Sequence, residues 1–129
     1  TRISLAFRTG RAAISSGVLV DVPEQVSIIQ AEVKRMVAGM AIHYLNATKQ
    51  KVVDGESQNK VNHYLSEAWA FIFGIQFCQN PDMDRNTVEG LLEQIDADFE
   101  GFSQSTVLIN AMIDDIAAAS GLEAYKNDL

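Results

Sequence analysis

Residues 58–78, with the sequence QNKVNHYLSEAWAFIFGIQFC, decide the fold class of this chain. After Glu67 the stretch is apolar nearly all the way round a helix, which is typical of a helix that neighbours cover on several sides. We therefore expect the central helix of a bundle, which the Asn80–Pro81 pair ends. At about 100° per residue, the face that should meet the core carries Val61, Leu65, Ala68, Ile72 and Ile75.

The segment before it, residues 23–51, has the clearest helical pattern. Pro23 suits the first turn of a helix, with Asp21 or Val22 at its cap. A stripe then recurs at spacings of four and three residues, which is the heptad spacing of helices that pack side by side. We expect this stripe to face inward, and we expect the loop at 54–57 to turn the chain back into an antiparallel pair. The stripe consists of Ile29, Val33, Met36, Met40, His43 and Ala47.

Three shorter segments complete the predicted architecture. We expect helices over residues 3–16, over about 86–95, and after Ser103, whose hydroxyl suits an N-cap. Gly121 suits the end of the last of them. We predict an all-α, antiparallel bundle of four to five helices that forms a single domain over residues 1–129. Because the chain begins without Met, we interpret it as a processed chain or a piece of a longer protein.

The charge distribution excludes one class of partner. The net charge is −7, and residues 79–129 carry two Lys or Arg against eleven Asp or Glu. A nucleic-acid interface needs a cationic surface, so we expect no nucleic-acid partner. The longest strongly apolar run, residues 68–77, is about half of the roughly 20 residues that span a bilayer, so we expect no transmembrane segment.

Residues for catalysis are missing from the sequence. It has no Gly-rich phosphate loop and no serine in a nucleophile-elbow pattern, so we expect that the protein is not an enzyme. Cys78 is the single cysteine, which leaves no cysteine-based zinc site, and we expect it to be a buried structural thiol. We also expect Trp69 and the phenylalanines to belong to the core.

Five side chains form the candidate metal site. His63 and Glu67 are four residues apart, so they lie side by side on a helix, where they could share a metal ion. His43 could approach them if the second and third helices pack antiparallel. Tyr44 and Tyr64 could then add phenolate oxygens, which suit Fe(III), whereas imidazole suits Zn(II) and Fe(II). The alternatives are a surface ion pair for Glu67 and a hydrogen-bonded core position for His43.

Two weaker patterns accompany these residues. His43-Tyr44-Leu45 recurs as His63-Tyr64-Leu65, 20 residues later. Residues 82–93 place oxygen donors at the spacing of a calcium loop. Thr87, however, stands where that loop needs glycine, so we interpret the segment as a turn that leads into an acidic helix start. The acidic stretch 93–100 is interpreted as a solvated face.

The segment His63–Phe71, HYLSEAWAF, resembles the Glu-Gly/Ala-Trp-Ala-Phe helix of algal iron-assimilating, low-iron-inducible periplasmic proteins. It is similar, more distantly, to a helix of imelysin-like bacterial surface proteins. The ending Tyr125–Leu129, YKNDL, also looks like the closing segment of the algal type. This resemblance implies an extracytoplasmic helical protein of iron uptake, with Glu67 and Trp69 at motif positions and His63 upstream.

Two functional hypotheses follow. The first is a non-enzymatic, periplasmic or secreted iron-binding protein, in which His63 and Glu67 are the main ligands and His43, Tyr44 and Tyr64 complete the site. The second is a structural or interaction subunit of a larger assembly, with a protein partner or a second copy of the chain and without a metal site. The strongly apolar third helix and the acidic C-terminal half motivate the second hypothesis.

Overall fold

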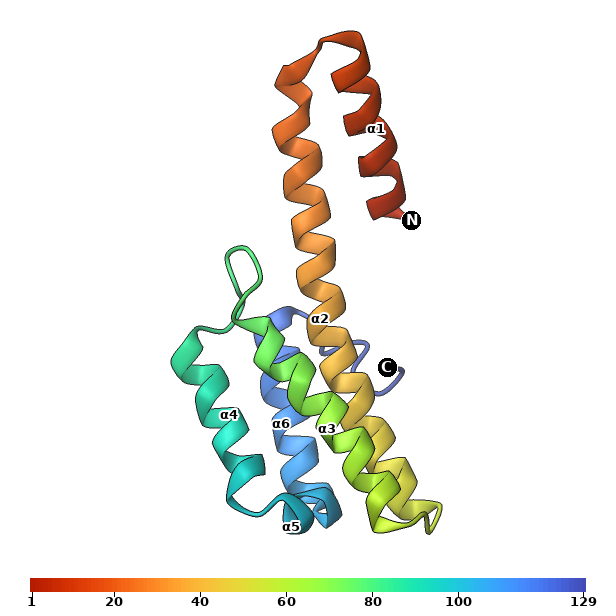
Figure 1. The fold of residues 1–129 in the computed structure, drawn as a ribbon, viewed down its shortest axis with the longest axis vertical. Helices are drawn as coiled ribbons and strands as arrows, with labels where there is room; N and C mark the ends of the chain where they lie inside the picture. Colours follow the sequence, from red (N-terminus) through yellow and green to blue (C-terminus); the bar gives the residue numbers. More distant parts are fainter.

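The computed structural model describes all of residues 1–129 and is entirely helical (Figure 1). It contains six α-helices and one 3-10 turn, so the predicted all-α class is confirmed. In chain order the elements are α1 (Arg2–Ser16), η1 (Leu19–Asp21), α2 (Val22–Val53), α3 (Gln58–Ile75), α4 (Arg85–Ala97), α5 (Phe99–Gln104) and α6 (Thr106–Ser120). None of these helices combines the length and the apolar character that crossing a bilayer requires.

The molecule has two parts that differ in how much surface they bury. The C-terminal half of α2 packs with α3, α4, α5 and α6 in a bundle, whereas α1 folds back along the N-terminal half of α2, well away from the bundle (Figure 1). We call residues 2–33 the arm and residues 34–129 the bundle. Gly17 makes the turn between α1 and η1 with a φ of 75°, a conformation that glycine adopts without strain. The arm is therefore a helical hairpin that projects from the bundle.

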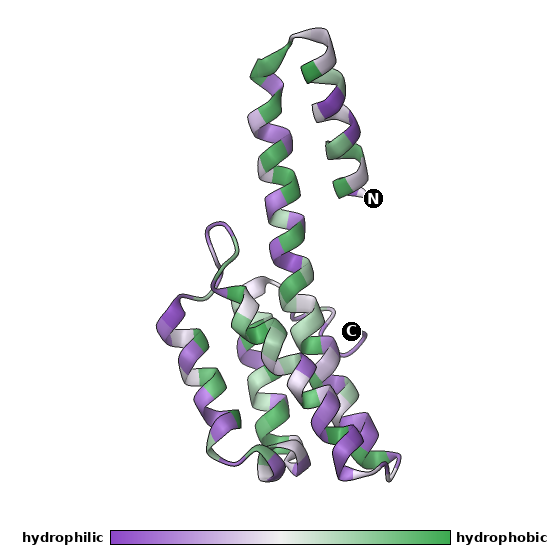
Figure 2. Cartoon of the chain, viewed as in Figure 1, coloured by the Kyte–Doolittle hydropathy of each residue, from purple (hydrophilic) through white to green (hydrophobic).

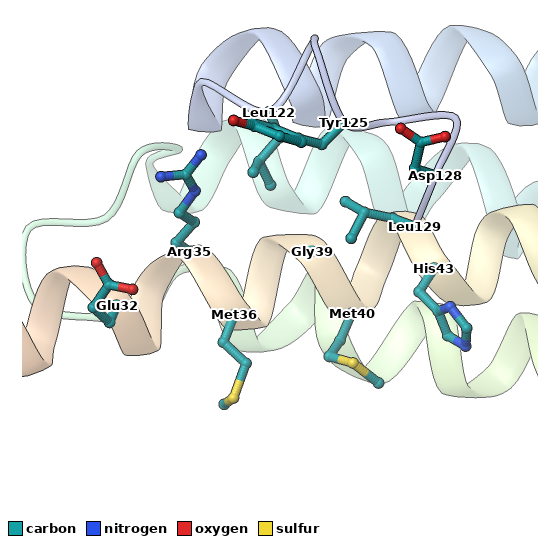
Figure 3. A pocket seen from close by; sticks show the side chains of 10 residues that line it. All are labelled: Glu32, Arg35, Met36, Gly39, Met40, His43, Leu122, Tyr125, Asp128 and Leu129. Carbon is teal, nitrogen blue, oxygen red and sulfur yellow. The ribbon is translucent and has the colours of Figure 1, made fainter. Parts of the chain in front are cut away.

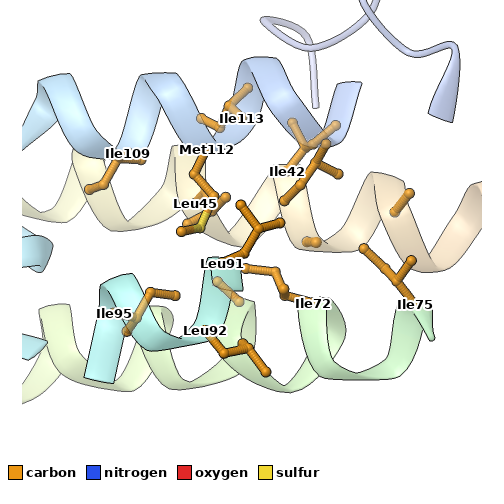
Figure 4. Close-up of a cluster of buried hydrophobic side chains, with 14 of the residues drawn as sticks. Ile42, Leu45, Ile72, Ile75, Leu91, Leu92, Ile95, Ile109, Met112 and Ile113 are labelled. Atoms are coloured by element: carbon orange, nitrogen blue, oxygen red, sulfur yellow. The ribbon is translucent and has the colours of Figure 1, made fainter. Parts of the chain in front are cut away.

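The bundle encloses one continuous hydrophobic core of 20 buried residues (Figure 4). The face predicted for α3 is confirmed, because all five of its residues are at most 2% exposed. Facing residues of the other helices fill the same core, among them Leu45, Leu92, Ile95, Ile109 and Met112. Burial of such side chains contributes roughly 1.5–3 kcal/mol each relative to exposure, which makes the bundle the stable part of the chain.

The predicted orientation of α2 is wrong within the bundle. The heptad-spaced stripe does not face the core there, and His43, which we expected to point inward, is exposed. The face of α2 that meets α3 and α6 instead carries Ala38, Ala41 and Leu45. The two alanines on that face let neighbouring helices approach closely, and Ile42 and Leu45 fill the core beside them. The stripe faces α1 in the arm. In the bundle it faces the C-terminal tail, residues 121–129.

Several local expectations also need correction. Residues 99–104 form α5, a helix that the sequence did not reveal, and Asp98 caps it by accepting a hydrogen bond from the Gly101 amide. Ser105, not Ser103, caps α6; Ser103 is buried within α5. α3 ends at Ile75 rather than near residue 78. Gly121 ends α6 in the left-handed conformation, with a φ of 64°, as predicted.

The phenylalanines do not all belong to the core. Phe102 is buried, but Phe7, Phe73 and Phe77 are 59%, 41% and 70% exposed, and Trp69 is only half-buried. The C-terminal end of α3 is therefore covered on one face only, because α4 packs beside it rather than over it. The apolar run that indicated a central helix thus has an outer side that faces solvent.

Candidate functional site

The repeated His-Tyr-Leu pattern marks the antiparallel pairing of α2 with α3. Leu45 and Leu65 are both fully buried, and the rings of Tyr44 and Tyr64 lie 6.2 Å apart between their centroids. Tyr44 also stacks on Phe71, with ring centroids 5.6 Å apart. In both copies of the pattern the Leu fills the core and the Tyr fills the contact between the helices. The repeat is explained by helix packing.

The structure brings together only some of the five predicted metal ligands. His43 and His63 are exposed, and each ring meets the edge or face of the tyrosine that follows it, with centroids 5.3 and 5.6 Å apart. Glu67 is half-buried, and no cationic group lies within 4 Å of its carboxylate, so the ion pair that was the alternative for Glu67 is not formed. No three His, Cys, Asp or Glu side chains lie close enough together to hold one metal ion. Between the two helices, Tyr44 and Tyr64 are the candidate ligands whose rings come into contact.

A first surface hollow lies where the C-terminal tail crosses α2, and it has a volume of about 500 Å³ (Figure 3). Met36, Met40 and His43 project from α2 at one side, and Tyr125 and Leu129 of the tail lie at the other. The tail is held by a hydrogen bond from the Asn46 side-chain amide to the Lys126 carbonyl, by an ion pair between Lys126 and Asp114, and by the Arg35 guanidinium, which lies 5.6 Å from the centre of the Tyr125 ring.

A second hollow of about 500 Å³ runs along the arm between α1 and α2. Its apolar lining includes Phe7 and Ile14 of α1 and Val26 and Ile29 of α2. The close approach of the two helices depends on small residues, since α1 buries only Ala6 and Ala13. A two-helix hairpin cannot cover these larger side chains by itself, so the hollow stays open to solvent. We call it the arm groove.

The hydrophobic surface continues beyond the groove to the tip of the arm. Val18, Leu19 and Val20 are 47%, 61% and 81% exposed there, at the point most distant from the bundle (Figure 2). Sequence reasoning assigned no role to this triplet. Three consecutive exposed branched side chains are an unusual feature of a free surface. The signal that could have identified the surface is the combination of this triplet with Phe7 and Ile14, one heptad apart on α1.

A third feature is a row of aromatic rings on the outer side of α3. Trp69 stacks on Phe73 with centroids 5.4 Å apart and an interplanar angle of 16°, and Phe73 meets Phe77 edge to face at 5.2 Å. Beside this aromatic row runs an acidic row on α4, formed by Glu89, Glu93 and Asp96. The Trp69 indole nitrogen donates a 3.0 Å hydrogen bond to Asp96 Oδ1, which joins the two rows.

The residues with calcium-loop spacing have structural roles. Asp82 pairs with Lys34 at 2.7 Å and fastens the α3–α4 loop to α2. Asp84 is the N-cap of α4 and accepts a 2.8 Å hydrogen bond from the Thr87 amide. Hydrogen bonds from the Thr87 and Asn86 amides stabilise its charged form and hold the pKa of Asp84 below its ordinary value. The prediction of a turn that leads into a helix start is confirmed.

Cys78 lies just beyond the end of α3 and is half-buried rather than fully enclosed. Burial, with a smaller contribution from Asp82, raises the pKa of its thiol. A raised pKa reduces the thiolate fraction at neutral pH, and the thiolate is the reactive form. The environment of Cys78 therefore makes it a slow nucleophile.

These features define an all-helical protein with a closed bundle and an exposed, hydrophobic hairpin. The chain belongs to the family described as a domain of unknown function, DUF4856, whose pattern matches residues 1–123. No curated protein matches the chain significantly, and no solved structure does. The family therefore covers both the arm and the bundle.

Proposed function

We propose that this protein is a non-enzymatic interaction module that docks onto another protein surface through its arm. One observation carries the proposal, namely the amount of hydrophobic surface that the arm exposes. Fifteen large hydrophobic side chains of the protein are exposed, and eight of them lie in the arm, which is about a quarter of the chain. They are Leu5, Phe7, Ile14, Val18, Leu19, Val20, Val26 and Val33.

Such a concentration of exposed hydrophobic side chains favours binding to another surface and is unfavourable in contact with water. Contiguous exposed apolar patches on soluble proteins mark sites of association. A groove between two helices, lined by Phe7, Ile14 and Val26, accepts the apolar face of a further helix, whose side chains at spacings of three and four residues fill it. In the arm, α2 also carries exposed polar residues outside the groove, such as Ser27 and Gln30.

Light scattering combined with an environment-sensitive hydrophobic dye tests this proposal. If the arm is a docking surface, the purified chain either self-associates or binds the dye as a monomer. A variant with Phe7→Gln, Leu19→Gln and Val20→Gln should lose whichever behaviour the wild type shows. The matched control replaces Val107 and Val53, which are 78% exposed on the bundle, with Gln. A wild-type monomer that binds no dye would overturn the proposal.

A second candidate function, iron binding, is favoured by one specific observation. The rings of Tyr44 and Tyr64 lie 6.2 Å apart, with an exposed imidazole beside each. Phenolate and carboxylate oxygens suit Fe(III), and Glu67 is on the same helix as Tyr64. The resemblance to the algal iron-assimilating proteins also supports this candidate, and it implies an extracytoplasmic location.

Titration of the metal-stripped protein with Fe(III), Fe(II) and Zn(II) tests this second candidate. A phenolate site predicts visible charge-transfer absorption with Fe(III), which a Tyr44→Phe/Tyr64→Phe variant should lose and a Tyr125→Phe control should keep. If His43 or His63 also binds, affinity should fall between about pH 7.5 and 5.5, as imidazole takes up a proton. Equal behaviour of both variants would exclude a site at these tyrosines.

A further inference from the structure

The aromatic row on α3 is a helix face without a partner inside the molecule. Phe73 and Phe77 are 41% and 70% exposed, although each contacts its neighbour in the row. Trp69 and Phe73 lie one turn apart on α3, about 6 Å at 1.5 Å per residue, and Phe77 follows in the turn just beyond Ile75. The face of an aromatic ring carries partial negative charge, so such a row attracts cationic side chains as well as apolar ones.

The acidic row on α4 adds negative charge along the same line. Glu89 is paired with Arg85 at 2.6 Å, but neither Glu93 nor Asp96 has a cationic group within 4 Å. Both carboxylates are exposed, and Glu93 borders the same small hollow as Phe73. The α3–α4 face, formed by the aromatic row with Glu93 and Asp96, therefore combines aromatic rings with carboxylates that have no cationic partner. A guanidinium group can bind to both.

The complementary chemistry is present on α1 of the same chain. This helix carries three arginines and no acidic residue. Arg2 pairs with Glu32, but Arg8 and Arg11 are exposed and have no carboxylate within 4 Å. They are three residues apart, as are Glu93 and Asp96, so on two helices the charged groups have matching separations. Phe7 and Ile14 flank the arginines and can pack on the rings.

We propose that α1 of one copy docks on the α3–α4 face of a second copy, with Arg8 and Arg11 against Glu93 and Asp96. The two faces cannot meet within one chain, because α1 packs on α2 beyond the bundle and on the far side from α4 (Figure 1). The contact joins unlike surfaces, so it generates a ring or a head-to-tail chain. This inference rests on the proposed function and names the partner surface for the arm.

An exchange of charges tests the proposal by sedimentation velocity over a range of protein concentrations. Wild type should associate, and association should weaken as ionic strength rises, because salt screens exposed charges. Arg8→Glu/Arg11→Glu and Glu93→Arg/Asp96→Arg should each weaken association at least about tenfold, because each variant opposes like charges. An equimolar mixture of the two variants should restore association, since both of its mixed contacts are complementary.

The outcomes separate this inference from the proposed function. The control variant Asp115→Arg/Glu123→Arg makes the same charge change at exposed positions away from the face, and it should associate like the wild type. Restoration in the mixture also shows that both variants are folded. If the wild type associates and the variants associate equally well, the assigned face is wrong while docking by the arm stands. If the wild type is a monomer at all concentrations, self-association is wrong, and dye binding decides the proposed function separately.

Discussion

The bundle and the arm are built from similar helices but are stabilised in different ways. In the bundle, the C-terminal half of α2 and helices α3 to α6 enclose 20 buried residues, whereas α1 buries only two alanines against α2. The bundle buries most of its hydrophobic side chains, whereas the arm leaves Phe7, Ile14 and Leu19 in solvent. This difference is the basis of the proposal that contacts outside the single chain complete the arm, and the following predictions test the comparison.

The largest expected difference is in the response to truncation of a hydrophobic side chain. Leu45 and Ile72 are fully buried, so Leu45→Ala or Ile72→Ala should lower the free energy of unfolding by about 2–5 kcal/mol. Leu19→Ala removes a side chain that is 61% exposed and should change it by less than about 0.5 kcal/mol. Urea denaturation followed by circular dichroism measures both. A large effect of Leu19→Ala in the monomer would mean that the arm is already packed.

A second prediction concerns the independence of the two parts. Ala6 is 2% exposed between α1 and α2, so Ala6→Glu places a charge in that contact and should release α1. Amide exchange in α1 should then become at least about tenfold faster while the bundle core keeps its protection. Ala12→Glu, on the exposed side of the same helix, is the matched control and should change little. Loss of protection throughout the bundle would show that the parts unfold together.

A third, smaller effect comes from glycines within helices. A Cβ at Gly90 of α4 would meet nothing within 4 Å. Gly90→Ala should therefore raise the free energy of unfolding by about 0.5–1 kcal/mol, because it reduces the freedom of the unfolded chain. At Gly10 of α1 a Cβ would lie 3.4 Å from Gln25 Cβ, so Gly10→Ala should affect the arm contact and not the denaturation midpoint of the bundle. If Gly90→Ala and Gly10→Ala raised the free energy of unfolding equally, the separation of the arm from the bundle would be contradicted.

The smallest expected effect is a pH dependence at the start of α4. The pKa of Asp84 is lowered from its ordinary value of 3.8 by the hydrogen bonds from the Thr87 and Asn86 amides. The stability that ionised Asp84 contributes to the folded state is therefore complete well above pH 3.8. It is lost as the pH falls through the lower, folded-state pKa. Asn also caps helices but does not ionise. The difference in melting temperature between wild type and Asp84→Asn should thus shrink in acid, and a difference that stays constant with pH would contradict the assignment.

The sequence predicted the bundle better than the arm for a physical reason. The apolar face of α3 can be predicted from its spacing, because neighbours in the same chain bury every residue of that face. The stripe on α2 has an equally regular spacing, yet Met36 is 56% exposed and His43 is exposed. Periodicity shows that a helix face is apolar, but it does not show which neighbour covers it. Ala38 and Ala41, which share the true core face with Ile42 and Leu45, are too small to make that face stand out.

The candidate site shows the same limit. The sequence placed Tyr44 and Tyr64 near each other, and the antiparallel pairing of α2 with α3 does so. It could not show that His43 points away from the core, because that depends on the rotation of α2 about its own axis. The arm groove could not be predicted at all, since it needs the fold-back of α1 onto α2. α5 was missed because six residues are too few to establish a period.

Hydrogen–deuterium exchange of the wild type at low protein concentration tests the central claim most directly. If the arm depends on outside contacts, amides of α1 and of residues 22–33 should exchange orders of magnitude faster than those of residues 38–48, which lie on the same helix within the bundle. Raising the concentration should protect the arm and the α3–α4 face together. Protection of the arm equal to that of the bundle, in a chain shown to be monomeric, would contradict the account.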